Sequence, residues 1–317
     1  MKQNEITFLL GVMPRSGTNY LANVLCCHKD VSAPEPLWED FFLSNSSALS
    51  KFERKCFRFW NEKWEAEPKY LTRKNLRESM GNGLLDFISR TQSCPELESV
   101  SKIKLLAKTP TVRGLADFFD YFPNSKLILL VRDGRDIVSS GTKSFGWSFD
   151  KAARDWSKAV QSITTFLSKN NHFSESVMLV KYEDLYADEE ATLTSILNFM
   201  DLDANKFDFE ALNSLGISGS SELVDKQGKV TWNEKLKKSD EFSPVERWRK
   251  WPSIKQKRFD YLAGEQLDAL GYKRASEAVS SFNNLIQKSL TLGWLITIVP
   301  KTLYELLKNR RFILKSN

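Results

Sequence analysis

The sequence predicts an α/β fold in which a central parallel sheet is flanked by helices. Short apolar runs of strand length recur along the chain, and segments with helical spacing of apolar residues lie between them. The runs are continuous rather than alternating, which is typical of strands that are covered on both faces. Strands that alternate with helices favour a doubly wound sheet, with ligands bound at the carboxyl ends of the strands.

The elements of this fold can be assigned in chain order. Strands are expected at 6–12, 103–107, 126–131 and 176–182. The first helix is expected at "NYLANVL", directly after a glycine-rich turn, and another after the turn through Gly134. Further helices are expected at 111–122, 149–170 and 189–202.

Three stretches depart from this alternation. Residues 38–100 are rich in Trp, Phe, Lys and Glu without a strand signal, so we expect a helical insertion over the sheet. Residues 216–245 are polar and rich in Gly, Ser and Lys, which predicts a long surface loop. We therefore expect a single domain over 1–275 and a C-terminal helical extension over 276–317.

The composition narrows the class of protein. The chain has 317 residues, 41% of them hydrophobic and 27% charged, which is the balance of a soluble globular protein. Its net charge of +6 suits an anionic partner, but the basic residues are spread rather than striped, so no nucleic-acid partner is expected. The four cysteines include no C-x-x-C pair, and neither zinc nor a redox dithiol is indicated.

The ends of the chain bear on location. The N-terminus is too short and too acidic for a signal peptide, and no uncharged apolar run reaches the roughly 18 residues of a spanning helix, so a cytoplasmic protein is expected. The tail from 284 to 317 carries an apolar stripe flanked by Lys and Arg. We expect it to dock on its own domain or on a second copy in a homodimer; peripheral contact with an anionic membrane is the alternative.

The loop "GVMPRSGTNYL" at 11–21 follows the first strand and leads into the first helix. It resembles the phosphate-binding pattern G-x-x-x-x-G-K-[ST], but the Lys and its following hydroxyl are missing and the basic residue is Arg15. Backbone N–H groups of Ser16 to Asn19 lie at a helix N-terminus, which favours an anion, and Gly17 permits close approach. Arg15 could add a bidentate contact to a phosphate or sulfate. The loop therefore predicts a 5′-phosphate site that does not require a metal.

A second constellation lies in "LILLVRDGRDIVSS". Arg132 ends a buried strand and Ser140 follows eight residues later in the next helix, so both could converge on one phosphate. The alternative is that Arg132 pairs with Asp133 or Asp136 in a surface network. A third segment, "LVKYEDL", places Tyr182 at a strand end, where its ring could lie against a base.

"PRSGTNYL", "VRDGRDIVSS" and "VKYEDL", in this order, resemble the sulfotransferases that use 3′-phosphoadenosine 5′-phosphosulfate (PAPS). The resemblance covers roughly residues 6–252 and implies a P-loop-type sheet. It implies that the first motif holds the 5′-phosphosulfate, the second the 3′-phosphate and the third the adenine. The implied donor-binding residues are Arg15, Ser16, Gly17, Thr18, Asn19, Tyr20, Arg132, Ser140 and Tyr182.

Weaker matches follow the protein-tyrosine and related bacterial branch of this family. "HKDVSAPEP" resembles the segment that carries the catalytic base, which implies Glu35, with Glu39 as the second candidate. "LLAKTP" resembles a segment whose lysine stabilises the transferring group, here Lys108. The histidine base of the cytosolic branch has no counterpart in a matching motif, which favours a carboxylate.

Two further segments resemble donor contacts. "SGSSELV" resembles a stretch whose serine binds the donor near the reaction centre, which implies Ser220, with Ser221 one position away. "PVERWRKW" resembles a segment whose basic residue precedes a tryptophan and binds the nucleotide, which implies Arg247.

The resemblance implies in-line transfer of a sulfuryl group from PAPS to a hydroxyl or amine, leaving 3′-phosphoadenosine 5′-phosphate (PAP), without a metal. We expect a small natural product or a glycolipid as the acceptor, with peptide tyrosine as the alternative. Two other classes remain open, a nucleotide-binding module without transfer and a metal-dependent P-loop kinase. The joint presence of Arg15, Glu35 and Lys108 disfavours the first, and the missing Walker lysine disfavours the second.

Overall fold

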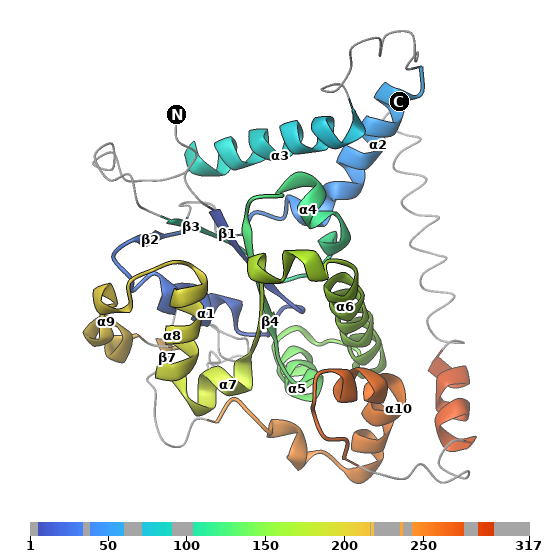
Figure 1. The fold of residues 1–317 in the computed structure, drawn as a ribbon. Helices are drawn as coiled ribbons and strands as arrows, with labels where there is room; N and C mark the ends of the chain where they lie inside the picture. Colours follow the sequence, from blue (N-terminus) through green and yellow to red (C-terminus); the bar gives the residue numbers. More distant parts are fainter. Residues whose placement is uncertain are drawn as a thin grey trace, which may run out of the picture.

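The computed structural model describes residues 6–33, 39–59, 72–90, 104–215, 217–218, 235–236, 243–275 and 285–294. Its central sheet has five parallel strands in the order β2-β3-β1-β4-β5 (Figure 1). The strands are β1 (Ile6–Gly11), β2 (Val31–Ser32), β3 (Lys104–Thr109), β4 (Lys126–Val131) and β5 (Val177–Lys181). The predicted α/β fold with a central parallel sheet is confirmed, and β2 is an additional edge strand.

Helices connect and cover these strands. The α-helices are α1 (Thr18–Leu25), α2 (Ser46–Phe57), α3 (Arg73–Arg90), α4 (Phe118–Tyr121), α5 (Gly134–Phe145), α6 (Phe149–Lys169), α7 (Tyr182–Ala187), α8 (Glu189–Phe199), α9 (Phe209–Ser214) and α10 (Ser253–Ala269). The 3-10 helices are η1 (Leu43–Asn45), η4 (Leu115–Asp117), η5 (Asn171–Ser176), η6 (Ala204–Lys206) and η7 (Arg247–Lys250). A separate helical segment spans residues 285–294.

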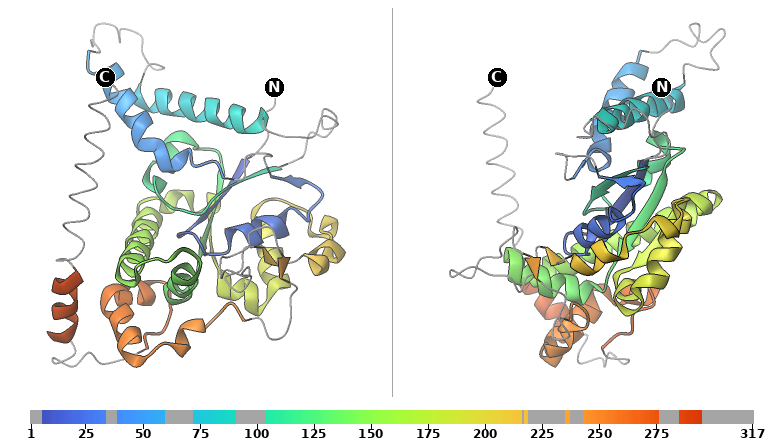
Figure 2. Two further views of the ribbon diagram at one scale, coloured as in Figure 1. Left: turned by 180° about the vertical axis from the view of Figure 1, so that it is seen from behind. Right: turned by 90° about the vertical axis from the view of Figure 1, so that its left-hand side faces the viewer.

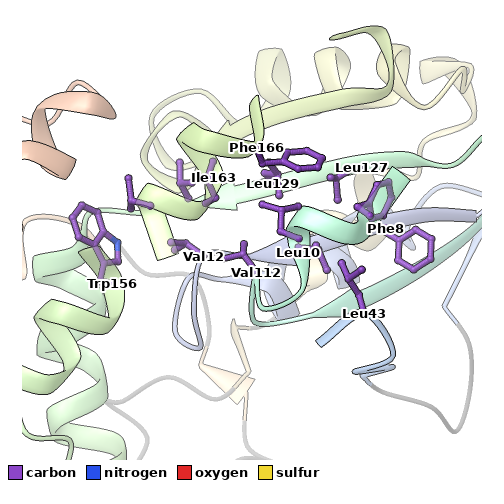
Figure 3. Packing of buried hydrophobic residues seen from close by; sticks show 14 of the residues in the cluster. Phe8, Leu10, Val12, Leu43, Val112, Leu127, Leu129, Trp156, Ile163 and Phe166 are labelled. Carbon is purple, nitrogen blue, oxygen red and sulfur yellow. The ribbon is translucent and has the colours of Figure 1, made fainter. Parts of the chain in front are cut away.

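Both faces of the central strands β1, β3 and β4 are buried: neighbouring residues of a strand point to opposite sides, and helices cover each side. Phe8 and Leu10 of β1 belong to the cluster that includes Trp156 of α6 (Figure 3). Leu9 belongs to the other cluster, with Leu21 of α1. Helices α4, α5, α6 and α10 cover the first face, and α1, α7, α8 and α9 cover the second (Figures 1 and 2). This two-sided burial explains the continuous apolar runs of the sequence.

The sheet has a switch point between β1 and β4. These strands pair in parallel, yet the chain leaves β1 into α1 on one face and leaves β4 into α5 on the other. Connections that diverge in this way open a crevice beyond the carboxyl ends of the two strands, where ligands bind in doubly wound folds. Residues 12–17 and 132–140 both begin at this crevice.

Two expected elements differ in the structure. The helix expected at 111–122 begins only at η4, because Gly114 adopts a left-handed conformation (φ 81°) and approaches the carbonyl of Leu43 too closely for a side chain. The expected loop at 216–245 contains two short strands, β6 (Ile217–Ser218) and β7 (Lys235–Leu236), which pair antiparallel. Each strand has only two residues, which is too short to leave a pattern in the sequence.

The described parts of the expected insertion, 39–59 and 72–90, consist mainly of the helices η1, α2 and α3. The buried carboxylate of Glu53 in α2 pairs with Arg73 (3.2 Å) and Arg77 (2.5 Å) of α3. Because a buried charge must be paired, these two bonds hold α3 across α2.

The segment 285–294 lies against α10 (Figure 2). The buried Arg258 of α10 donates to the carbonyl oxygen of Gln287 (2.8 Å) and to Oγ1 of Thr291 (3.1 Å). Arg154 of α6 stacks over the ring of Trp294, with 4.7 Å from Cζ to the ring centroid. This part of the tail therefore docks on its own domain, while residues 276–284 and 295–317 lie outside the described part. Among the described residues, no helix is both long and apolar enough to cross a membrane.

Candidate active site

The loop between β1 and α1 has an unusual backbone that depends on glycine. Gly17 adopts φ 99°, and the non-glycine residue Arg15 adopts φ 77°. A Cβ at Gly11 would lie 2.3 Å from Oγ of Ser16, so a side chain there would displace the loop. These conformations turn the loop back over the end of β1 and bring it to the start of α1.

Arg132 connects this loop to the rest of the crevice. Its Nη1 donates to the carbonyl oxygen of Arg15 (2.7 Å) and its Nη2 to that of Pro244 (2.6 Å). The sequence left open a pairing of Arg132 with Asp133 or Asp136. Asp133 accepts a bidentate pair from Arg135 instead (Nη2 to Oδ2, 2.7 Å), and Asp136 accepts from two backbone N–H groups of residues 246–248. Arg132 is therefore held by carbonyl oxygens at the crevice.

Three guanidinium groups gather around the loop. Nε of Arg15 donates to Oγ of Ser140 in α5 (2.9 Å), which joins the first motif to the second. Burial, together with the positive charges of Arg132 and Arg247, lowers the pKa of Arg15 to about 10. Repulsion among these groups would be relieved by an anion, so the arrangement favours a strongly charged ligand.

Tyr182, the first residue of α7, brings the third motif to the same place. A Cβ at Gly17 would lie 2.5 Å from two carbons of the Tyr182 ring, so the ring packs directly on the loop glycine. Cζ of Arg132 lies 4.6 Å from the centroid of that ring, a cation–π contact. All three sequence motifs therefore meet at one site.

Two buried polar atoms at this site suit a phosphate or sulfate. Oγ of Ser16 and Nε of Arg132 are buried and have no hydrogen-bond partner among the described residues. Thr18 is buried at the start of α1, whose N-terminal N–H groups favour negative charge. The oxygens of a bound anion would satisfy these donors. Within the described ranges, no three His, Cys, Asp or Glu side chains form a metal-binding group.

Lys108 lies near the end of β3, beside the loop. It is buried, and its Nζ donates to Oδ1 of Asn19 in α1 and lies 3.7 Å from Oε1 of Glu39. Burial lowers its pKa, and the nearby Glu39 carboxylate opposes that shift. The second candidate base thus lies beside the predicted catalytic lysine. The first candidate, Glu35, lies outside the described residues.

The remaining predicted residues are placed as follows. Tyr20 donates its hydroxyl proton to Oε1 of Glu189 at the start of α8. Arg247 donates from Nε to the carbonyl oxygen of Ser243 (2.8 Å), and its charge acts on Arg15 and Tyr182. Ser220 and its neighbour Ser221 lie outside the described residues.

Asp40 is a site residue that the sequence did not reveal. Its Oδ1 accepts from Oγ1 of Thr109 and from the backbone N–H of Phe42, both at 3.1 Å, while its Oδ2 is buried without a hydrogen-bond partner among the described residues. Glu39, the residue before Asp40, contacts Lys108, the residue before Thr109. Residues 39–40 therefore pack as a pair against residues 108–109. The only signal in the sequence is an acidic pair before "FF", which is ordinary for a surface turn.

Asp40→Asn is expected to stabilise the fold at pH 8 relative to the wild type. Burial raises the pKa of Asp40 from 3.8 to about 6, so the native state binds its proton more tightly than the unfolded chain does. The carboxyl therefore costs stability progressively as pH rises from about 4 through 6. The difference between variant and wild type should move in favour of the variant by roughly 2–3 kcal/mol from pH 4 to pH 8.

Urea unfolding of both proteins at pH 4, 6 and 8 measures this difference. The other buried carboxyls titrate alike in the two proteins and cancel. A difference that stays constant with pH would show that the pKa of Asp40 is the same in the native and the unfolded chain, contrary to this expectation.

Comparison with known proteins agrees with this geometry. The family model described as "Sulfotransferase family" matches residues 7–206, more than half of the chain. Protein-tyrosine sulfotransferase 1 of Danio rerio is 26% identical over 261 residues, which cover 79% of this chain and 66% of that protein. The chain thus spans just under two thirds of the length of that curated relative.

Solved structures share the fold. The sulfotransferase domain from the curacin biosynthetic pathway aligns with a TM-score of 0.50 at 20% identity, over 86% of this chain and 99% of that one. The sulfotransferase domain of the Synechococcus PCC 7002 olefin synthase aligns with a TM-score of 0.53 at 18% identity, over 86% and 97%. The family model also spans the loop after β1, Lys108, Arg132 and Tyr182. Because it matches more than half of the sequence, the chain belongs to the sulfotransferase family.

Proposed function

We propose that this protein transfers a sulfuryl group from PAPS to a hydroxyl or amine of a small-molecule or glycolipid acceptor. The observation that carries the proposal is that Arg132 contacts the glycine-dependent loop that carries Arg15, while the charge of Arg247 helps to lower the pKa of Arg15. Buried donors of Ser16 and Arg132 that lack partners among the described residues provide further contacts for an anion. Family membership supports the same reaction.

The residues divide into two anion-binding groups. The loop N–H groups and Arg15 are suited to the 5′-phosphosulfate, at the start of α1. Arg132, Ser140 and Arg247 are suited to the 3′-phosphate, the group that distinguishes PAPS from ATP. The hydrogen bond from Arg15 to Ser140 joins these two groups of residues directly.

When bound, PAPS supplies an activated sulfuryl group. Sulfuryl transfer needs positioning and stabilisation of charge in the transition state more than covalent chemistry from the protein. Arg15 and Lys108 would provide fixed positive charge near the transferred group, each contributing about 3–4 kcal/mol. A carboxylate, Glu35 or Glu39, would accept the proton of the acceptor, an effect of roughly 10²–10⁴-fold.

An aromatic pair beside Arg15 supports a partly apolar acceptor. Phe145, at the end of α5, is 45% exposed and stacks on Trp147 with 5.3 Å between ring centroids. Cζ of Arg15 lies 5.7 Å from the Phe145 ring. An exposed aromatic surface next to the proposed transfer site would bind a flat or apolar group. Peptide tyrosine is the second candidate acceptor, on the single observation of the curated relative.

Calorimetric titration with PAP, 5′-AMP, ADP and ATP in the absence of metal tests the donor class. We expect PAP to bind at least tenfold more tightly than 5′-AMP, and Arg132→Ala to abolish that preference because it removes a charge-assisted contact to the 3′-phosphate. Arg54→Ala, at an exposed position of α2, is the control and should leave the preference intact. A further ATP titration with Mg²⁺ added tests the alternative class. ATP that binds only when Mg²⁺ is present, with no preference for PAP in its absence, would overturn the proposal in favour of a kinase.

A further inference from the structure

A carboxylate of α5 holds the segment that carries Arg247. Residues 243–250, here called the strap, cross the first turn of α5 although they lie more than 100 positions later in the chain. Oδ2 of Asp136 accepts from the backbone N–H of Glu246 (2.8 Å) and its Oδ1 accepts from that of Trp248 (3.3 Å). Arg247 therefore sits between two residues whose backbones are fixed by one side chain.

The strap is anchored at other points as well. Pro244 accepts a hydrogen bond from Arg132, so the same arginine contacts both the strap and the loop after β1. Cζ of Arg135 lies 3.6 Å from the centroid of the buried Trp248 ring. These contacts hold the strap against α5 on both sides of Arg247.

The residue that precedes Arg247 in the strap has an unfavourable backbone conformation. Glu246 adopts φ 59°, in the left-handed region that is unfavourable for residues other than glycine. Such a conformation persists only where surrounding contacts hold it in place. Here the carboxylate of Asp136 holds it, because it accepts from the backbone N–H groups on both sides of Arg247. In this arrangement the positive charge of Arg247 contributes to lowering the pKa of Arg15 and opposes the raised pKa of Tyr182.

We propose that Asp136 is a positioning residue for donor selectivity: it aims Arg247 at the 3′-phosphate by fixing the backbone on both sides of that arginine. This inference rests on the proposed function. Asp136 itself is only 1% exposed, and both its oxygens accept hydrogen bonds from backbone N–H groups. Its hydrogen bonds go to the strap, so its effect on the donor would pass through Arg247.

A purely structural role for Asp136 would change stability and leave the selectivity between ligands unchanged. The discriminating readout is therefore the ratio of the dissociation constants of 5′-AMP and PAP, measured calorimetrically on the full chain. Asp136→Ala should lower this ratio about tenfold, since its two hydrogen bonds to the strap are lost, while 5′-AMP affinity stays within about twofold. Asp136→Asn keeps one acceptor oxygen and should give an intermediate ratio.

A double variant tests whether Asp136 works through Arg247. If it does, Asp136→Ala combined with Arg247→Ala should lower the ratio no further than Arg247→Ala alone. Arg249→Ala is the matched control on the strap: this arginine is exposed, pairs with Glu246 at the surface and should leave the ratio unchanged.

Each outcome is decisive. A wild-type ratio near one would overturn the proposed function, and this inference with it. A wild-type preference for PAP that is kept in Asp136→Asn and Asp136→Ala would overturn the inference alone. Fully additive losses in the double variant would also overturn it. If Asp136→Ala does not fold, Asp136→Asn with and without Arg247→Ala gives the same decision.

Discussion

Lys108→Ala is expected to lower kcat about 10²–10³-fold while PAP binds almost as tightly as before. The side chain is buried at the end of β3, beside Asn19 at the N-terminal end of α1. Removing a fixed charge from a site with little water loses its stabilisation of the transition state, and that interaction is worth most in a buried setting. The variant also removes the ion-pair partner of Glu39. Because Glu39 is partly exposed, water can largely replace that partner.

The measurement combines single-turnover kinetics with calorimetric PAP binding, using any acceptor that a screen identifies. Lys104→Ala is the matched control, because Lys104 lies on the same strand at the opposite end and pairs with Asp201 at 3.4 Å. We expect no change in kcat for it. An equal loss in PAP affinity and in kcat/KM for Lys108→Ala would show that this lysine binds the donor in the ground state.

The fold was predictable because its central strands β1, β3 and β4 are buried on both sides. The run "KLILLV" is β4 without an error at either end, since every residue after Lys126 is buried. Elements held by tertiary contacts left no such pattern. β2 has two residues and depends on pairing with β3, and the start of η4 depends on the close approach of Gly114 to Leu43.

The part of the candidate site that could be predicted consists of residues within short continuous sequence motifs. Arg132 and Tyr182 follow directly after strands β4 and β5, and Arg15 lies in the loop after β1, so their convergence follows from topology. Asp40 and Asp136 are different. Their roles come from hydrogen bonds to Thr109 and to the strap, which are distant in sequence, and an isolated aspartate carries no sign of them.

Gly17→Ala is the second change for which we expect a large effect, namely a roughly 10- to 200-fold loss of PAP affinity. The added methyl would lie 2.5 Å from the ring of Tyr182, which is itself packed under Arg132. Either the ring moves, and with it the contact to Arg132, or the loop moves away from the crevice. Both responses separate the loop N–H groups from the arginines that act with them.

Left-handed strain alone cannot produce that loss, and the chain contains the control that separates the two causes. Gly146 also has a positive φ, 63°, but a Cβ there would meet no atom within 4 Å. Gly146→Ala should therefore cost about 1–2 kcal/mol of stability in urea unfolding without changing PAP affinity. Gly17→Ala should show a similar backbone cost together with the loss of binding. If the two variants bind PAP equally well, the contact between Gly17 and Tyr182 does not shape the phosphate site, and the anion must be held by the arginines without the loop.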